Sequence, residues 1–353
     1  MADTTKIEWS DATWNPITGC TLVSPGCENC YAAELAASRF KNHPSRIGLA
    51  RRNAKGVAKF TGEVRFNEGW LTQPLHWRKP RMVFVCAHGD LFHEDVPDDW
   101  IDRIFAVMAL CPQHTFQVLT KQPKRMRKYI SDIEDSEIAE FATDYWQQEK
   151  GRWQLMPSTI GRYRNRTEFG NEIETWVDVW PLPNVWLGVS VEDQKHADER
   201  IPALLQAPAA IRFISAEPLL GPIDLRNSCD GHHFLNALTG VRSLDSPDGK
   251  QAPDNNDWSG LDWVIVGGES GKHARPMHPR WARSIRDQCQ AADVPFFFKQ
   301  WGAYLHDSIW NPHADPAPTV EFKGEIYHRC GKTRAGRYLD TGYFDEMPKV
   351  RDA

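Results

Sequence analysis

The chain of 353 residues lacks several features that would assign it to a class at once. No apolar run approaches the roughly 20 residues that a membrane-spanning helix needs. The N-terminus, MADTTKIEWSDATW, lacks the basic and then apolar order of a secretory signal. There is no basic excess, because the net charge is −5 and the pI is about 6.2. These absences argue against a membrane protein and against a protein that coats nucleic acid through a generally basic surface. They predict a cytoplasmic protein.

Disulfides are also not expected, because cytosolic thiols stay reduced. The chain nevertheless places three of its eight cysteines in one short stretch, TWNPITGCTLVSPGCENCYA, residues 13–32. These are Cys20, Cys27 and Cys30, with the spacing Cys-x6-Cys-x2-Cys. A close thiol group of this kind indicates metal binding or catalysis.

The number of cysteines in this stretch bears on the metal. A structural zinc site needs four protein ligands, and the chain has no second Cys-x-x-Cys. Zinc would therefore need a distant histidine, such as His88 or His93. A 4Fe–4S cluster held by three cysteines explains the odd number better, because its fourth iron is left open for a ligand that is not protein.

Short apolar runs recur along the chain and predict strands that are buried on both faces. They cover residues 81–90, 115–123, 184–193, 210–218, 262–270 and 294–302, and a first strand is expected to end near Trp14 to Thr18. Helical patterns lie between several runs, notably DDWIDRIFAVMALCP and HPRWARSIRDQCQAADV. This alternation predicts a parallel sheet. Since the G-x-G-x-x-G of a dinucleotide-binding fold is missing, we expect a complete or partial (βα) TIM-like barrel.

Three segments interrupt this alternation. Residues 131–183 and 227–260 are interpreted as insertions into a barrel that spans residues 1–304, and residues 305–353 as a C-terminal extension.

Polar residues follow the apolar runs directly. In a parallel barrel, these strand ends share one face, where active sites are built. We therefore expect a polar cavity of mixed charge, formed by Asp90, Lys121, Ser190, Glu192, Glu217, Glu269, Lys299 and Gln300. Gly267 and Gly268, just before Glu269, would let the backbone approach a ligand closely. Basic residues also cluster at 39–59, including Arg51 and Arg52, and at 121–128, where they either face solvent or hold phosphate.

The stretches TKIEWSDATWNPITGC, NVWLGVSVEDQ, ISAEPLLGPIDL, VIVGGESG and PFFFKQWG resemble the phage Gp37/Gp68 family (DUF5131), a radical S-adenosylmethionine (SAM)-like group. The resemblance covers about residues 4–304. It implies a partial barrel of the radical SAM type, with a 4Fe–4S cluster on Cys20, Cys27 and Cys30. It also implies that SAM binds the open iron and is cleaved, by an electron from a donor, to a 5′-deoxyadenosyl radical that attacks a substrate.

On this basis Asp90, Ser190, Glu192, Glu217, Gly267, Gly268 and Glu269 are the candidates for binding the cofactor. The candidates for binding a substrate are Lys121, Lys299, Gln300, Arg51 and Arg52. The substrate could be a nucleotide or nucleic acid, and a partner protein is also possible. The chain departs from the usual Cys-x3-Cys-x2-Cys, and Asn29 stands where an aromatic residue is usual. Two alternatives stay open: a zinc-stabilised nucleic-acid-binding protein without catalysis, and a degenerate barrel with a structural or redox-sensing cluster.

Overall fold

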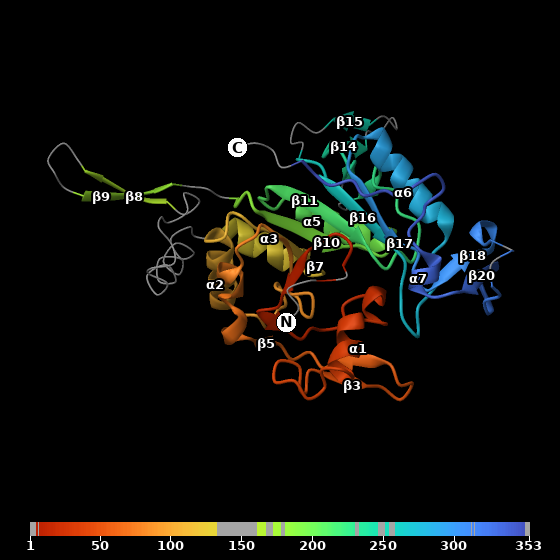
Figure 1. The fold of residues 1–353 in the computed structure, drawn as a ribbon. Helices are drawn as coiled ribbons and strands as arrows, with labels where there is room; N and C mark the ends of the chain where they lie inside the picture. The colour runs from red at the N-terminus through yellow and green to blue at the C-terminus, as the bar shows by residue number, and fades with distance from the viewer. Residues whose placement is uncertain are drawn as a thin grey trace.

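The computed structural model describes residues 5, 7–132, 161–166, 172–177, 181–229, 233–245, 251–253, 258–311, 313 and 315–349. Its centre is a parallel sheet of β1 (Ala12–Trp14), β6 (Met82–Val85), β7 (Thr115–Thr120), β10 (Val185–Ser190), β11 (Ile211–Ala216), β16 (Trp263–Gly267) and β17 (Phe296–Gln300). The seven strands lie side by side in chain order, whereas a doubly wound sheet reverses its order midway. The sheet curls into an open half-barrel (Figure 1). The predicted partial α/β barrel is therefore present.

In the described part of the chain, the connections after β6, β7, β10 and β16 contain the helices α2 (Asp98–Ala109), α3 (Pro123–Asp132), α5 (Gln194–Leu205) and α6 (Pro279–Ala291), respectively. In α2, the buried residues Ile101, Ile104 and Phe105 lie on one face, as the helical spacing predicts. Both helices expected from the sequence are confirmed, and so are the seven strands. The helices pack on the outer face of the sheet and form the larger hydrophobic core with it.

The concave face of the half-barrel has a second core, which is mainly aromatic. It contains Phe84, Trp186, Ile211, Phe213, Trp263, Ile265 and Phe297 from the strands. Trp9, from the segment before β1, inserts among them, with its ring centroid 4.8 Å from that of Phe84. Because side chains alternate between the two faces of a strand, the residues between these aromatics point outward to the helices.

The segment between β1 and β6 carries the cysteines. It forms β2 (Ile17–Thr18), the 3-10 helix η1 (Pro25–Cys27), α1 (Tyr31–Ala37), β3 (Ala50–Arg52), β4 (Ala58–Phe60), β5 (Arg65–Phe66), η2 (Glu68–Trp70) and η3 (Gln73–His76). Figure 1 shows α1 and β3 together on the side where the N-terminal segment lies.

The described parts of the two predicted insertions are antiparallel. Within 131–183 they include the hairpin of β8 (Gly161–Arg166) and β9 (Glu172–Val177), while most of that segment lies outside the described residues. Within 227–260 they form a sheet of β12 (Ser228–Cys229), β13 (His233–Leu235), β14 (Arg242–Asp245) and β15 (Gln251–Pro253).

The residues after β17 form a small antiparallel sheet and then return to the barrel. β18 (Tyr304–His306), β20 (Glu325–Arg329) and β19 (Thr319–Phe322) pair in that order, with η4 (Asp307–Ile309) and α7 (Lys332–Ala335) beside them. Further on, Phe298 N donates to Phe344 O (2.9 Å), so this return segment covers the edge of β17. No helix in the described part of the chain is both long and apolar enough to cross a membrane.

The concave core makes a testable prediction at Gly188 in β10. A Cβ atom at this position would lie 2.5 Å from the ring of Phe213. We expect Gly188→Ala to lower the free energy of unfolding by about 1–3 kcal/mol, because the ring would have to move within a packed core. Gly69→Ala is the control, since a Cβ there meets no atom within 4 Å. Equal midpoints of urea unfolding for the two variants would contradict this packing.

A cavity at the strand ends and its cysteine loop

A cavity of about 410 Å³ lies at the carboxyl ends of the parallel strands. All three clustered cysteines line it. So do eight of the polar and glycine residues predicted at the strand ends: Asp90, Lys121, Ser190, Glu217, Gly268, Glu269, Lys299 and Gln300. Glu192 and Gly267 are not among the lining residues.

The two-residue period of the strands explains how these side chains meet. Trp186 of β10 belongs to the concave core, and Ser190, four residues later on the same face, lines the cavity. In the same way, Phe213 of β11 is followed by Ser215 and then by Glu217 beyond the strand end. Both strands thus pass from an apolar base to a polar rim on one face.

The cysteines come from the loop that follows β2, and all three are free, half-buried thiols. Burial raises the pKa of the Cys20 thiol well above its ordinary value, and the nearby charge of Asp90 adds to this effect. Burial also raises the pKa of the Cys30 thiol. The raised pKa values favour the protonated thiols of Cys20 and Cys30, whereas a bound metal deprotonates the thiols that coordinate it.

The sulfur atoms are not gathered around a single point. In the described part of the chain, the clustered cysteines do not form a group whose ligand atoms all lie within 4.8 Å of one another. The histidines considered for a zinc site do not complete such a group. His93 Nε2 lies 2.7 Å from Thr21 Oγ1, and His88 does not line the cavity.

Glu192 lies beneath the cysteine loop, with no exposed surface. Ser24 Oγ of the loop donates to Glu192 Oε1 (2.7 Å), and Arg200 Nη1 donates to Oε2 (3.1 Å). Lys121 Nζ lies 3.6 Å from Oε1. A Cβ at Gly26 would lie 2.3 Å from the same carboxylate, so only glycine leaves the loop this close. Glu192, expected at the cavity surface, instead anchors the loop to the barrel.

Arg275, in the loop between β16 and α6, holds the cysteine loop from its other side. Its Nε and Nη2 donate to the two carboxylate oxygens of Glu269 at 2.8 and 2.7 Å. Its Nη1 reaches Glu28 Oε2 (3.0 Å), and its Nη2 also donates to Pro25 O (2.8 Å). Asn29 Nδ2 donates to Glu269 Oε2 (3.1 Å) as well. The Glu269 carboxylate thus lines the cavity and also binds Arg275 and Asn29, which hold the cysteine loop.

Glu217, a carboxylate of the cavity rim, is held by two side chains. Lys299 Nζ lies 2.8 Å from its Oε2, and Gln300 Nε2 donates to its Oε1 (3.1 Å). A Cβ at Gly267 would lie 3.1 Å from the Glu217 side chain, which explains a glycine at the end of β16.

Asp90, in contrast, has its oxygens occupied by its own surroundings. Thr120 Oγ1 and Phe92 N donate to Oδ1 at 2.6 and 3.0 Å, and Lys121 N donates to Oδ2 at 3.0 Å. These bonds tie the end of β6 to the end of β7.

The remaining substrate candidates, Arg51 and Arg52, do not line the cavity. They lie on β3, where Arg52 forms a surface ion pair with Glu34. In the second basic segment, Arg125 pairs with Asp98 (2.7 Å). Much of the charge that suggested phosphate binding is therefore used within the protein.

Sequence reasoning missed several groups at the site. Arg275 had no recognisable signal beyond its place in ARPMHP, just after VGGES. The N-terminal residues Glu8 and Trp9 also line the cavity, as does Lys332 of α7. Lys332 Nζ lies 2.7 Å from Glu8 Oε1, so the N-terminal segment and α7 meet at the cavity wall.

The buried anchor gives a prediction for Glu192. Glu192→Gln would leave Arg200 as a buried charge without its carboxylate, which typically costs about 3–5 kcal/mol of stability. Glu68→Gln is the control, because Glu68 pairs with Arg103 at the surface with 66% of its side chain exposed, where such pairs contribute about 0–1 kcal/mol. Urea unfolding measures both losses. If Glu192→Gln cost no more than the control, the anchor would have no energetic role.

Comparison with known proteins gives a family but no annotated relative. No curated protein and no solved structure matches the chain. One family model, described as a protein of unknown function, matches residues 4–348, which is nearly the whole chain and includes the cysteine loop and every strand of the half-barrel. The chain therefore belongs to the DUF5131 family.

Proposed function

We propose that the protein is an iron–sulfur enzyme of the radical SAM type. The observation that carries this proposal is that Cys20, Cys27 and Cys30 all line one cavity at the carboxyl ends of a parallel half-barrel. In a 4Fe–4S cluster each cysteine binds a different iron, so three cluster ligands need not lie within 4.8 Å of one another. The odd number of thiols leaves one iron for a small-molecule ligand.

When bound, a 4Fe–4S cluster would pass one electron from an external donor to SAM, which splits into methionine and the 5′-deoxyadenosyl radical. The protein's own contribution is to hold the loop and to shape the cavity. Glu192 and Arg275 fix the loop from two sides. The aromatic base formed by Trp9 and Phe84 closes the cavity from below.

The charges around the cavity favour a zwitterionic ligand such as SAM. Glu217 offers a carboxylate to an ammonium group, and Lys299 beside it offers a cation to a carboxylate. Leu119 and Tyr31 add apolar and aromatic surface on which a nucleobase can pack.

The cations of the cavity give little support to a phosphate-rich substrate. Lys121 lies 3.6 Å from Glu192, Lys299 lies 2.8 Å from Glu217, and Lys332 pairs with Glu8. Each of these lysines is balanced by a carboxylate, so together they provide no excess positive charge to attract a polyanion. We therefore favour a substrate of low charge over a nucleic acid.

The function is tested by anaerobic reconstitution with iron and sulfide, followed by incubation with SAM and dithionite. We expect about four irons per chain and the formation of 5′-deoxyadenosine. Cys20→Ala, Cys27→Ala and Cys30→Ala should each lose the cluster absorption and the product. Cys330→Ala is the control, because this half-buried thiol lies outside the cavity. Stoichiometric zinc in a protein that rejects iron would overturn the proposal, and a cluster without 5′-deoxyadenosine would remove its catalytic part.

A second prediction concerns ligand recognition by Glu217. Glu217→Gln removes one charged hydrogen bond, which typically contributes about 1.5–3 kcal/mol, so SAM should bind roughly tenfold to a hundredfold more weakly. Iron content should not change, because Glu217 is not a thiol ligand. Glu199→Gln, an exposed carboxylate on α5, serves as the control. Equal titrations of the cluster-loaded variants with SAM would assign Glu217 to another role.

A further inference from the structure

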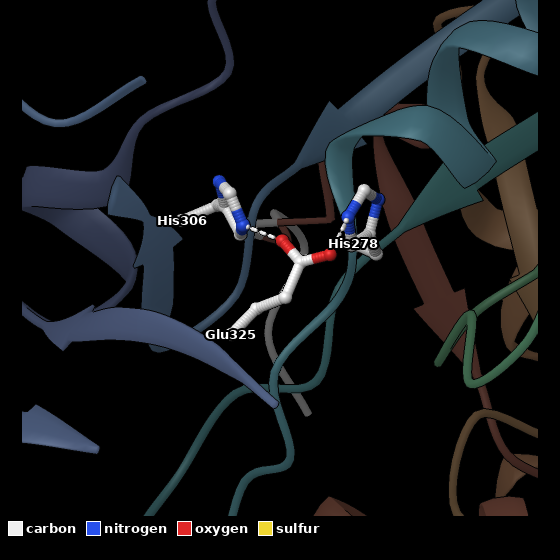
Figure 2. Close-up of side chains that lie close together, drawn as sticks. All are labelled: His278, His306 and Glu325. Carbon is white, nitrogen blue, oxygen red and sulfur yellow. Dashed lines mark hydrogen bonds and ion pairs between the residues drawn. The ribbon is translucent and has the colours of Figure 1, made fainter. Parts of the chain in front are cut away.

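Outside the cavity, two imidazoles and one carboxylate converge on a single point. His278 precedes α6, His306 ends β18, and Glu325 begins β20. One ligand atom from each lies within 4.8 Å of the other two. In the described part of the chain this is the only group of three His, Cys, Asp or Glu residues that meets this criterion. Figure 2 shows the two rings on either side of the carboxylate.

The contacts direct the ligand atoms toward one another. His278 Nε2 lies 3.1 Å from Glu325 Oε1, and His306 Nε2 contacts Oε2. The two imidazoles are 14% and 12% exposed, while the carboxylate is 42% exposed. The nitrogen ligands are thus mostly enclosed, and the oxygen ligand opens to solvent, from which an ion can enter.

We propose that His278, His306 and Glu325 form a binding site for a divalent transition-metal ion, with Zn²⁺ as the best match. Two histidines and one glutamate are a protein ligand set of zinc sites that keep a fourth position for water. The same set also suits non-haem iron, but Zn²⁺ binds nitrogen and oxygen ligands more tightly than Fe²⁺ does. This proposal is independent of the function proposed for the cavity.

The far sides of the two rings show what metal binding would change. His306 Nδ1 accepts from Ser308 N (3.0 Å) and lies 2.7 Å from Ser308 Oγ, so its proton sits on Nε2 and faces Glu325. His278 Nδ1 accepts from Arg280 N (3.0 Å), so its proton now sits on Nε2 and faces Glu325. When Nε2 binds a metal, that proton moves to Nδ1 through solvent, and the contact with Arg280 N opens. His306 makes the same exchange at Ser308 N, and Ser308 Oγ can then accept its Nδ1 proton and orient the ring.

The position of the site indicates its role. His278 belongs to the loop before α6, which packs on the half-barrel, whereas His306 and Glu325 belong to the C-terminal sheet. An ion held by all three would cross-link the C-terminal sheet to the barrel. Tyr304 and Tyr327 of that sheet belong to a small separate hydrophobic cluster, while Leu305 of the same sheet packs against the main core. An ion would add a metal-mediated link to this hydrophobic packing.

The test must separate this site from the thiols. We would measure Zn²⁺ binding by equilibrium dialysis in the full chain carrying Cys20→Ala, Cys27→Ala and Cys30→Ala. About one Zn²⁺ per chain is expected. Adding His306→Ala should weaken binding by more than the roughly 10- to 100-fold that loss of an outer-shell partner causes. His328→Ala is the matched control, because this nearby imidazole pairs with Asp307 outside the group.

Co²⁺ as a probe identifies the ligand type. Its visible d–d bands should appear without a thiolate charge-transfer band, and they should disappear in Glu325→Gln. If the cysteine variant folds poorly, Glu325→Gln in the otherwise unchanged chain should lower the Zn²⁺ stoichiometry by about one. Failure to bind Zn²⁺ in the folded cysteine variant, or equal binding by the His306 and His328 variants, would show that the three groups form hydrogen bonds only and would overturn the proposal.

Discussion

The cysteine loop depends on one buried interaction, the carboxylate of Glu192. A carboxylate without exposed surface is stable only when its charge is balanced and its oxygens are bonded. Arg200 supplies the charge, and Ser24 of the loop supplies one of the hydrogen bonds. The loop thus helps to stabilise a charged carboxylate that the barrel buries. Gly26 follows from this, because a side chain at that position would occupy the space of the carboxylate.

The half-barrel arranges the rest of the cavity by a single geometric rule. Alternate residues of a strand face the same side, so a face that is aromatic at the amino end can become polar at the carboxyl end without any change of backbone. β11 shows this progression from Phe213 through Ser215 to the residue beyond the strand, Glu217. The aromatic base and the polar rim are therefore two ends of one surface. A rigid base beneath a charged cavity keeps the rim side chains in place.

The sequence predicted what depends on local pattern and missed what depends on distant partners. The buried runs indicated the strands, and their parallel order implied that the strand ends would meet. It could not separate Ser190-Val-Glu192 from Ser215-Ala-Glu217, because the two segments follow the same pattern. Their roles differ only because Arg200 and Ser24 reach Glu192, while Lys299 reaches Glu217. Arg275 and the group of His278, His306 and Glu325 were missed for the same reason.

The two proposed metal centres differ in the softness of their ligands. Thiolates are soft and favour iron–sulfur clusters, whereas imidazole and carboxylate favour ions such as Zn²⁺. The cysteine site and the His/Glu site would therefore prefer different metals, iron and zinc. Thiolates nevertheless also bind zinc well when iron is scarce. Zinc in a purified sample would then have two possible origins, and its amount alone would not identify the cavity as a zinc site. The ligand type, rather than the total metal, decides between an iron–sulfur enzyme and a zinc protein on this fold.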